Sequence, residues 1–100
     1  GFVFPIGDKP DDTSWTGFQS FNPEQQDGYL TVFREINNEQ PKAKLQLRFL
    51  AQKKVLLENL IDDSSRTVTT DTDGTLEFRM DRPATFQFYR YTVMDDAQSR

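Results

Sequence analysis

The stretch KAKLQLRFL (42–50) alternates apolar and polar residues along most of its length. The apolar residues are Leu45, Leu47 and Phe49, and the polar ones between them are Lys44, Gln46 and Arg48. Successive side chains of a β-strand point to opposite faces of its sheet. The stretch therefore predicts a strand with one buried face, and it places Phe49 in the core.

Other β-prone segments recur along the chain, separated by short breaks rich in Pro, Gly, Asn and Asp. They are residues 13–21, 29–36, 55–61, 66–70, 75–80 and 84–93. A short apolar segment at 1–4 is expected to end at Pro5. Breaks every eight to twelve residues leave no room for crossover helices, which excludes a parallel α/β fold. We predict an all-β antiparallel β-sandwich of about seven to eight short strands, with one domain over residues 1–94 and a polar, frayed tail over 95–100.

Three details of these strands are also predicted. Residues 29–36 carry apolar side chains on both parities, which indicates a central strand with both faces partly covered. Residues 84–93 change parity between Phe88 and Tyr89, which a bulge near that point would reconcile. Phe78 lies on the inward parity of residues 75–80 and is expected to be buried.

Composition excludes several classes of function. The chain has 100 residues, enough for one core, and a net charge of −4 with 12 basic residues scattered among 16 acidic ones. This charge disfavours nucleic acid and anionic membrane surfaces as partners. The chain has no Cys and no His, so it lacks thiolate chemistry, disulfides and the commonest general base. We expect no cofactor, and we interpret the initial Gly as a tag remnant or the cut end of a longer protein.

The stretch SWTGFQSF (14–21) spaces Trp15, Phe18 and Phe21 three residues apart. Gly17 in a strand interior indicates either a bulge or the close approach of another backbone. A bulge would place Trp15 and Phe18 on one face. A core seam is the favoured interpretation, with an interdomain surface or a sugar-stacking platform as alternatives. The candidates to line an interdomain or sugar-contact surface are Phe2, Phe4, Ile6, Trp15 and Phe21.

The segment DTDGTLE (71–77) has two interpretations. Asp71, Asp73 and Glu77 supply oxygen ligands of the kind that calcium prefers. The segment lacks the third ligand before the Gly and the Glu at loop position twelve of an EF-hand. Asp-Gly between two alternating runs is a strong hairpin signal, so a hairpin is favoured and a metal site remains the weaker alternative.

No catalytic residue is predicted. Glycoside hydrolysis needs two carboxyl groups facing each other across a cleft. The adjacent pairs Asp11–Asp12, Asp62–Asp63 and Asp95–Asp96 lie in loops or the tail and are expected to be solvated. Arg34 and Glu35, inside a β-run, are expected to form a cross-strand or interdomain ion pair.

Three stretches together resemble a known family. IGDKPDDTSWTGFQSF (6–21), DGYLTVFRE (27–35) and LEFRMDRPATFQFYRY (76–91) resemble the C-terminal β-domain of α-galactosidase-like (melibiase-type) glycoside hydrolases. The resemblance implies a non-catalytic antiparallel sandwich that packs against a catalytic (β/α)₈ barrel of the same bacterial polypeptide. It carries over no catalytic residue. The alternative is a carbohydrate-binding module that contacts an oligosaccharide through exposed aromatics. The compartment is left open among cytoplasm, periplasm and secretion.

Overall fold

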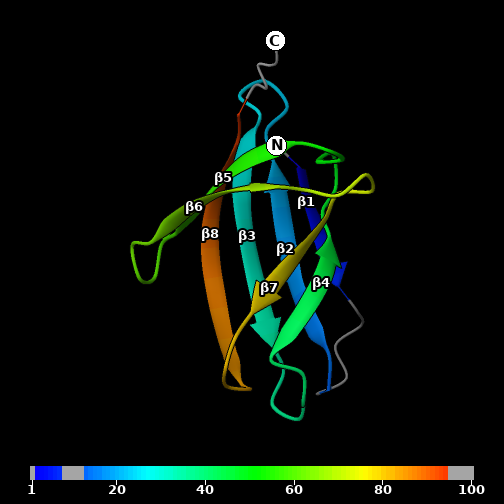
Figure 1. Cartoon of the computed structure of the whole chain (residues 1–100), viewed down its shortest axis with the longest axis vertical. Helices are drawn as coiled ribbons and strands as arrows, with labels where there is room; N and C mark the ends of the chain where they lie inside the picture. Colours follow the sequence, from blue (N-terminus) through cyan, green and yellow to red (C-terminus); the bar gives the residue numbers. More distant parts are fainter. Residues whose placement is uncertain (1, 8–12, 95–100) are drawn as a thin grey trace.

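Two antiparallel sheets face each other in the computed structural model, which describes residues 2–7 and 13–94. The larger sheet has the strand order β1-β2-β3-β8-β5-β6, and the smaller pairs β4 with β7. In Figure 1, β4 and β7 cross in front of the long strands of the larger sheet. The strands are β1 (Phe2–Gly7), β2 (Trp15–Phe21), β3 (Asp27–Arg34), β4 (Lys42–Gln46), β5 (Lys54–Asn59), β6 (Ser65–Thr69), β7 (Thr75–Arg79) and β8 (Thr85–Met94).

The predicted all-β antiparallel sandwich is confirmed. The expected end of the first segment at Pro5 is wrong, because β1 continues through Pro5 to Gly7. Within its sheet β1 pairs only with β2 and therefore forms an edge. Proline lacks an N–H but is tolerated on an edge strand, where that group would face away from the ladder. The predicted frayed tail at 95–100 lies outside the described residues.

Strand β2 contains no bulge at Gly17. Its pairing with β3 runs without interruption from Trp15 opposite Arg34 to Gln19 opposite Leu30. Trp15 and Phe18 therefore point to opposite faces, and the predicted bulge is wrong. The second interpretation of Gly17 is correct: a Cβ built there would lie 2.1 Å from the carbonyl oxygen of Thr31. Gly17 is required because a neighbouring backbone approaches too closely for a side chain.

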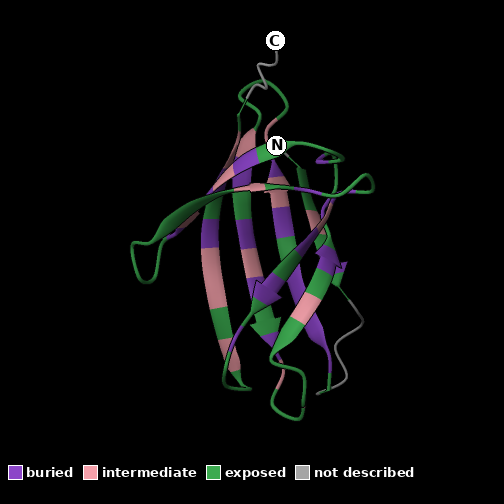
Figure 2. Ribbon diagram, viewed as in Figure 1, coloured by how far each residue is buried: buried purple, intermediate pink, exposed green. Residues whose placement is uncertain are grey.

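Strand β8 is also regular, which contradicts the predicted bulge near 88–89. Its pairing with β3 is continuous from Thr85 to Thr92. Tyr89 and Tyr91 face the core, whereas Phe86 and Phe88 face outward. Both parities are apolar because aromatic residues occupy both faces of one regular strand. Strand β3 lies inside the sheet between β2 and β8, as predicted. Its inner face is buried and its outer face is partly covered, as its apolar residues on both parities indicated. Figure 2 shows the alternating burial along these strands.

Phe49 is exposed, contrary to prediction. Strand β4 ends at Gln46, and Phe49 lies in a turn with φ of 65°. Leu50 takes the core position instead, fully buried. The buried Gln19 side chain holds this turn, accepting a hydrogen bond from the Arg48 N–H at 2.8 Å and donating to the Arg48 carbonyl at 2.9 Å. The alternating pattern therefore extends beyond the strand that it predicts.

The turn at 71–74 forms, but the predicted hairpin around it does not. Gly74 has φ of 86°, and its N–H donates to the Asp71 carbonyl at 3.0 Å. The strands on either side pair elsewhere, β6 with β5 and β7 with β4. The turn thus carries the chain from one sheet to the other. A turn signal alone does not decide which strands pair, because pairing depends on distant partners.

The core lies between the two sheets. Phe78 of the small sheet, almost fully buried as predicted, packs against Tyr89 of the large sheet with ring centroids 5.7 Å apart. Tyr91 is fully buried, and its hydroxyl donates to the Ser20 carbonyl and accepts from the Gln19 amide at 3.0 Å. Burial raises the pKa of Tyr91 to about 12. In the described part of the chain there is no helix long and apolar enough to cross a membrane.

Candidate functional site

The outer face of the six-stranded sheet carries a group of aromatic side chains, which we call the aromatic face. Its members are Phe18 of β2, Tyr29 and Phe33 of β3, and Phe86 and Phe88 of β8. Phe18, Tyr29 and Phe86 are about half exposed, at 54%, 48% and 52%. These three strands are adjacent in the sheet, so the rings gather over its middle.

Strand register fixes how the rings of the aromatic face meet. Phe33 lies directly opposite Phe86, and their centroids are 5.8 Å apart at an interplanar angle of 37°. Tyr29 and Phe88 lie on a diagonal of the same strand pair, with centroids 5.6 Å apart and an angle of 13°. These values match the offset and tilted arrangements that aromatic pairs prefer. Four of the five rings therefore pack as two pairs across β3 and β8.

Charged side chains border one end of the aromatic face. Arg90 lies opposite Tyr29 across the β3–β8 pair. Its guanidinium contacts the Asp27 carboxylate at 3.3 Å and the Glu58 carboxylate at 4.0 Å. An apolar centre with a polar border is the usual anatomy of a protein interface.

The five residues predicted to line a contact surface divide between core and surface. Ile6, Trp15 and Phe21 are buried, Phe4 is partly buried and Phe2 is exposed at 55%. All five occupy the inward parity of β1 or β2. The structure thus brings them together beside the core and not on the aromatic face.

At one end of the sandwich, Phe4 and Phe21 contact the ring of Phe49, and Phe2 stacks on Phe4. The centroid of Phe49 lies 5.0 Å from that of Phe21 and 5.5 Å from that of Phe4. The Arg48 guanidinium lies over Phe4, 5.3 Å from its centroid, within cation–π range. The Phe49 ring therefore packs on the inward-facing side chain of Phe4 in β1, although Phe49 itself remains exposed.

Trp15 is a structural residue. It is 3% exposed, and its indole N–H donates to the Asn38 side-chain oxygen at 3.1 Å and to the Gln40 carbonyl at 2.8 Å. A sugar could not stack on a ring that is covered on both faces. This burial removes the residue on which the sugar-platform interpretation rested.

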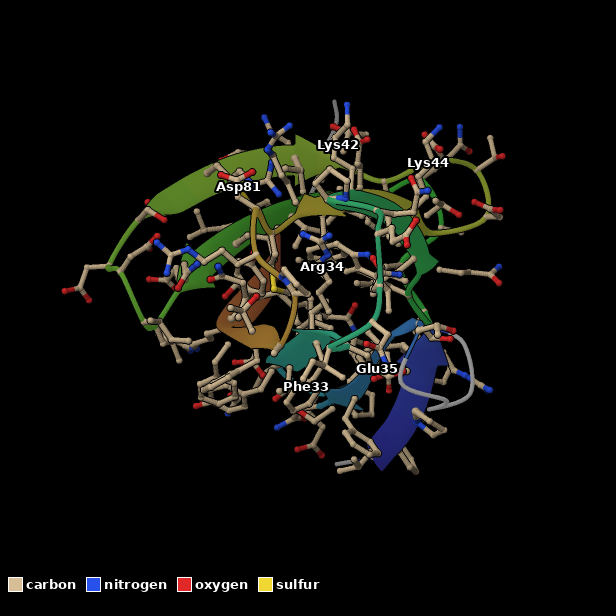
Figure 3. The ribbon with its side chains drawn as sticks, turned by 90° about the horizontal axis from the view of Figure 1, so that it is seen from below. Phe33, Arg34, Glu35, Lys42, Lys44 and Asp81 are labelled. Carbon is tan, nitrogen blue, oxygen red and sulfur yellow. The ribbon has the colours of Figure 1, made fainter. Side chains whose placement is uncertain are left out.

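Arg34 lies between the two sheets, as Figure 3 shows. It is 6% exposed, and its guanidinium donates to the Met80 carbonyl and to the carbonyl and side-chain oxygens of Asn38. The Glu35 carboxylate accepts a hydrogen bond from the Ser14 N–H at 3.0 Å. Among the described residues, Arg34 thus makes hydrogen bonds to neutral oxygens in place of the expected cross-strand ion pair, and one of these bonds ties β3 to Met80 directly after β7.

The acidic candidates do not converge. Hydrogen bonding by the Thr75 side chain and then by the Thr75 N–H, which lies 3.1 Å from the carboxylate, lowers the pKa of Asp73. Glu77 is on β7, where its carboxylate lies 4.0 Å from the Lys42 ammonium. Within residues 2–7 and 13–94, no three His, Cys, Asp or Glu side chains are close enough to hold a metal ion together.

The adjacent acids predicted to be solvated fall partly outside the described residues, which include neither Asp11–Asp12 nor Asp95–Asp96. Asp62 and Asp63 lie in the exposed turn after β5. Hydrogen bonds from the hydroxyl and the N–H of Ser64 lower the pKa of Asp62. A lowered pKa keeps the carboxyl ionised and is the opposite of what a general acid needs.

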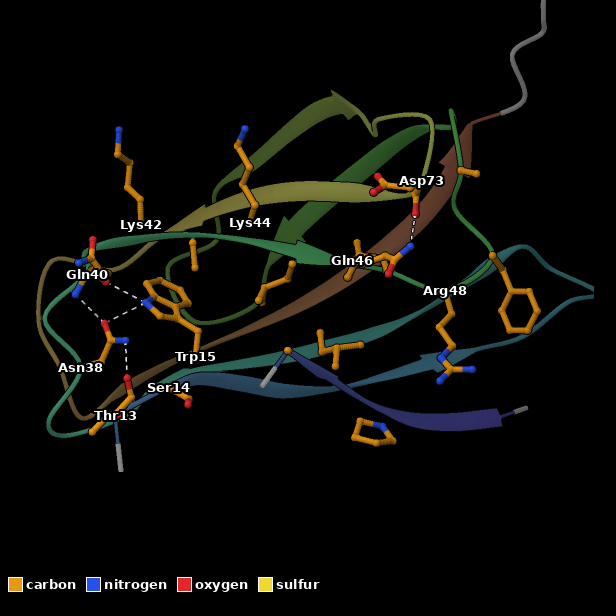
Figure 4. Close-up of a pocket in the computed structure, with 18 of the residues that line it drawn as sticks. Thr13, Ser14, Trp15, Asn38, Gln40, Lys42, Lys44, Gln46, Arg48 and Asp73 are labelled. Atoms are coloured by element: carbon orange, nitrogen blue, oxygen red, sulfur yellow. Dashed lines mark hydrogen bonds between the residues drawn. The ribbon is translucent and has the colours of Figure 1, made fainter. Parts of the chain in front are cut away.

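A groove of about 1130 Å³ opens between β1 and β4 (Figure 4). It is lined by residues 42–49 together with Pro5, Ile6 and Gly7 of β1, and Trp15 lies in its wall. Both β1 and β4 are at an edge of their sheets. The groove is therefore a gap between two strand edges.

Sequence reasoning missed the aromatic face because it assigned the alternating rings to the core or to bulges. The available signal was that β3 and β8 carry apolar residues at both odd and even positions, which is typical of a strand covered on both faces. Comparison of the chain with protein-family models, curated proteins and solved structures found no match.

Proposed function

We propose that this chain is a non-catalytic accessory β-sandwich that docks through its aromatic face onto the catalytic (β/α)₈ barrel of an α-galactosidase-like glycoside hydrolase. The observation that carries the proposal is the layer of partly exposed rings over β2, β3 and β8. The choice of partner rests on the resemblance of residues 6–21, 27–35 and 76–91 to the C-terminal domains of such enzymes.

Physical reasoning supports a protein partner for this face. Contiguous exposed apolar patches are uncommon on monomeric proteins, and aromatic residues are enriched at the centres of interfaces. Interdomain interfaces bury about 600–1,500 Å², an area that a face spanning three strands can supply. Docking would cover the outer side of β3 and β8. Both strands carry apolar residues on their two faces, a pattern typical of strands that are covered on both sides.

The geometry of the rings favours a protein surface over a sugar. Sugar stacking needs an open ring face. The rings of Tyr29 and Phe88 stack on each other, and the ring of Phe33 packs at a tilt against that of Phe86. A protein partner can pack on the edges and remaining faces of such rings, because dispersion contacts do not require one flat plane.

The test uses the full-length protein encoded by the gene that contains this chain, compared with the chain alone. Phe18→Ser and Phe86→Ser should each lower the melting temperature of the full-length protein by several degrees, because each leaves a gap in the interface. The same substitutions in the chain alone should change its melting temperature little. Ile36→Ser is the matched control, since Ile36 is 62% exposed but lies in the turn after β3.

Two results would contradict the proposal. The first is a full-length gene product without a (β/α)₈ barrel. The second is an equal response of the full-length protein to the Phe18, Phe86 and Ile36 substitutions. Calorimetric binding of galactosides by the chain alone, abolished by Tyr29→Ala with the fold intact, would assign the face to carbohydrate instead.

A further inference from the structure

The groove between the two sheets follows the edge of β4 and not only its inner face. Every residue from 42 to 49 lines it, including both parities of the strand. Because side chains alternate between faces, a groove that touches consecutive residues must run along the backbone edge. Strand edges present backbone N–H and C=O groups that can pair with a further strand.

The hydrogen bonds at the two ends of β4 show which backbone groups face this edge. The Met80 N–H donates to the Pro41 carbonyl at 2.9 Å, and the Leu47 N–H donates to the Gly74 carbonyl at 3.0 Å. In an antiparallel pair, the residues bonded to the partner strand alternate with residues whose backbone points away. Odd-numbered residues of this segment therefore bond toward β7, and the backbone groups of Lys42, Lys44 and Gln46 point into the groove.

These outward backbone groups have no protein partner among the described residues, since β4 pairs only with β7. A two-stranded sheet is marginal by itself, and a third strand would complete it. An open strand edge beside a groove is the arrangement that strand addition requires.

The side chains along the edge define what the added strand must carry. Lys42 and Lys44 point away from Trp15 on the outer face of the small sheet, as Figures 3 and 4 show. Ala43 and Leu45 face the sandwich interior, and Leu45 belongs to the core cluster with Ile6 and Trp15. A strand beside β4 would thus have one side next to lysines and the other over an apolar wall.

The charges are available for a partner. Lys44 makes no ion pair with any described residue, and Lys42 makes only the contact of 4.0 Å with Glu77. A second copy of β4 is unsuitable as the added strand, because antiparallel self-pairing places lysine beside lysine. Acidic side chains at alternate positions would instead pair with both lysines across the strands.

We propose that the β4 edge binds an extended polypeptide segment in which acidic residues alternate with apolar ones. The segment adds as a strand in the groove, with its acidic side chains beside Lys42 and Lys44 and its apolar side chains over Ala43, Leu45 and Ile6. Its backbone pairs with the N–H and C=O groups of Lys42, Lys44 and Gln46. This site lies between the sheets, away from the aromatic face, and does not depend on the proposed function.

The test titrates a short capped peptide of alternating Glu and Val into this chain. Trp15 is the chain's single tryptophan and lies in the groove wall, so its fluorescence reports occupancy. A peptide of the same composition with its Glu residues grouped at one end is the control, together with a peptide of alternating Lys and Val. Only the alternating Glu–Val peptide should bind.

Amide hydrogen exchange locates the binding mode. In the free protein, Ala43 and Leu45 should already exchange slowly because they bond to β7, whereas Lys44 and Gln46 should exchange fast. The peptide should slow exchange at Lys44 and Gln46 at least tenfold and change Ala43 and Leu45 little. A peptide that lies on the groove without pairing would leave Lys44 and Gln46 fast, and this result would overturn the proposal.

Two variants at one position separate charge from backbone pairing. Lys44→Gln removes one charge and should weaken binding by a few-fold, because exposed cross-strand ion pairs contribute little. Lys44→Pro also removes the N–H that faces the groove and should abolish binding, while the bonds of β4 to β7 remain. Circular dichroism and thermal melting check that both variants fold. Undiminished binding by a folded Lys44→Pro variant, or binding of the grouped-Glu peptide with equal affinity, would refute strand addition.

Discussion

The inner and outer faces of the six-stranded sheet carry similar residues but have different environments. On β3, Leu30 and Val32 are fully buried beneath the small sheet, whereas Tyr29 and Phe33 on the same strand are 48% and 37% exposed. Strand β8 repeats the contrast with Tyr89 and Tyr91 inside and Phe86 and Phe88 outside. Apolar character alone therefore does not decide burial. The small sheet covers one face, and nothing in the described residues covers the other to the same degree.

The two faces also differ in how they hold polar groups. Inside, Gln19, Arg34 and Tyr91 are buried, and each hydrogen-bonds to loops or neighbouring strands. Outside, Arg90 makes partly exposed contacts with Asp27 and Glu58. Buried polar groups must be satisfied, whereas exposed ion pairs are screened by water and add little. Stability should therefore depend on the inner face and be insensitive to the outer one.

The largest expected effect is the loss of a core ring. Phe78→Ala should lower the free energy of unfolding by about 3–5 kcal/mol, because it removes buried apolar area and leaves a cavity against Tyr89. Urea denaturation measures the change, with Phe86→Ala on the aromatic face as the matched control. A loss below about 1 kcal/mol for Phe78→Ala would contradict the assignment of the core to this ring.

The next effect tests the close approach of β2 and β3. Gly17→Ala places a Cβ 2.1 Å from the Thr31 carbonyl oxygen, so the strands must separate. We expect a loss of about 3 kcal/mol, at the upper end of the cost of overpacking. Thermal and urea denaturation would measure it. A neutral result would mean that the two strands can shift apart at this point without loss.

A pH dependence follows from Tyr91. In the unfolded chain its phenol loses the proton near its ordinary pKa of 10, whereas burial raises the pKa of Tyr91 to about 12 in the fold. Between these values the folded state holds more protons, so stability falls as the pH rises from 10 to 12. The contribution of Tyr91 to this fall should be about 2–3 kcal/mol.

Tyr91→Phe isolates this contribution. At neutral pH the variant should be less stable by about 1–2 kcal/mol, because it loses the hydrogen bond to the Ser20 carbonyl. Above pH 10 the difference between the two proteins should shrink and then reverse, as followed by urea denaturation at each pH. Parallel stability curves from pH 9 to 12 would argue against a buried neutral phenol.

The smallest effect is expected on the aromatic face of the chain alone. Phe86→Ala should lower the free energy of unfolding by less than about 1 kcal/mol, since the ring is half exposed and loses mainly its contact with Phe33. The comparison with Phe78→Ala then measures the difference between the faces directly. Equal losses at both sites would mean that the outer layer contributes to the fold as much as the core.

Much of the fold was predictable because strand formation depends on local pattern. The seven strongly patterned segments each overlap a strand, and Phe78 is buried as its parity indicated. The errors share one cause: a local pattern was used where distant contacts decide. Phe49 was misplaced because the Gln19 side chain holds a turn there, and a hairpin was predicted at 71–74 where the chain changes sheets.

The candidate site was less predictable for the same reason. The sequence identified Trp15 and the neighbouring rings as notable, but it could not show that Asn38 and Gln40 cap the Trp15 indole and that the ring lies in the core. It also could not show that Phe18, on β2, joins the rings of β3 and β8 on one face. That grouping depends on strand order and register.

The amino-acid sequence by itself determined the all-β class, the approximate positions of the strands, the acidic charge and the absence of His and Cys chemistry. Alternation, turn residues and composition are local properties, and they require no knowledge of the fold. Only the tertiary structure decided which of two apolar faces is covered, which edge of β4 is open, and why Gly17 must be glycine. Those features arise where segments far apart in the chain meet, because burial and backbone pairing are properties of two surfaces together.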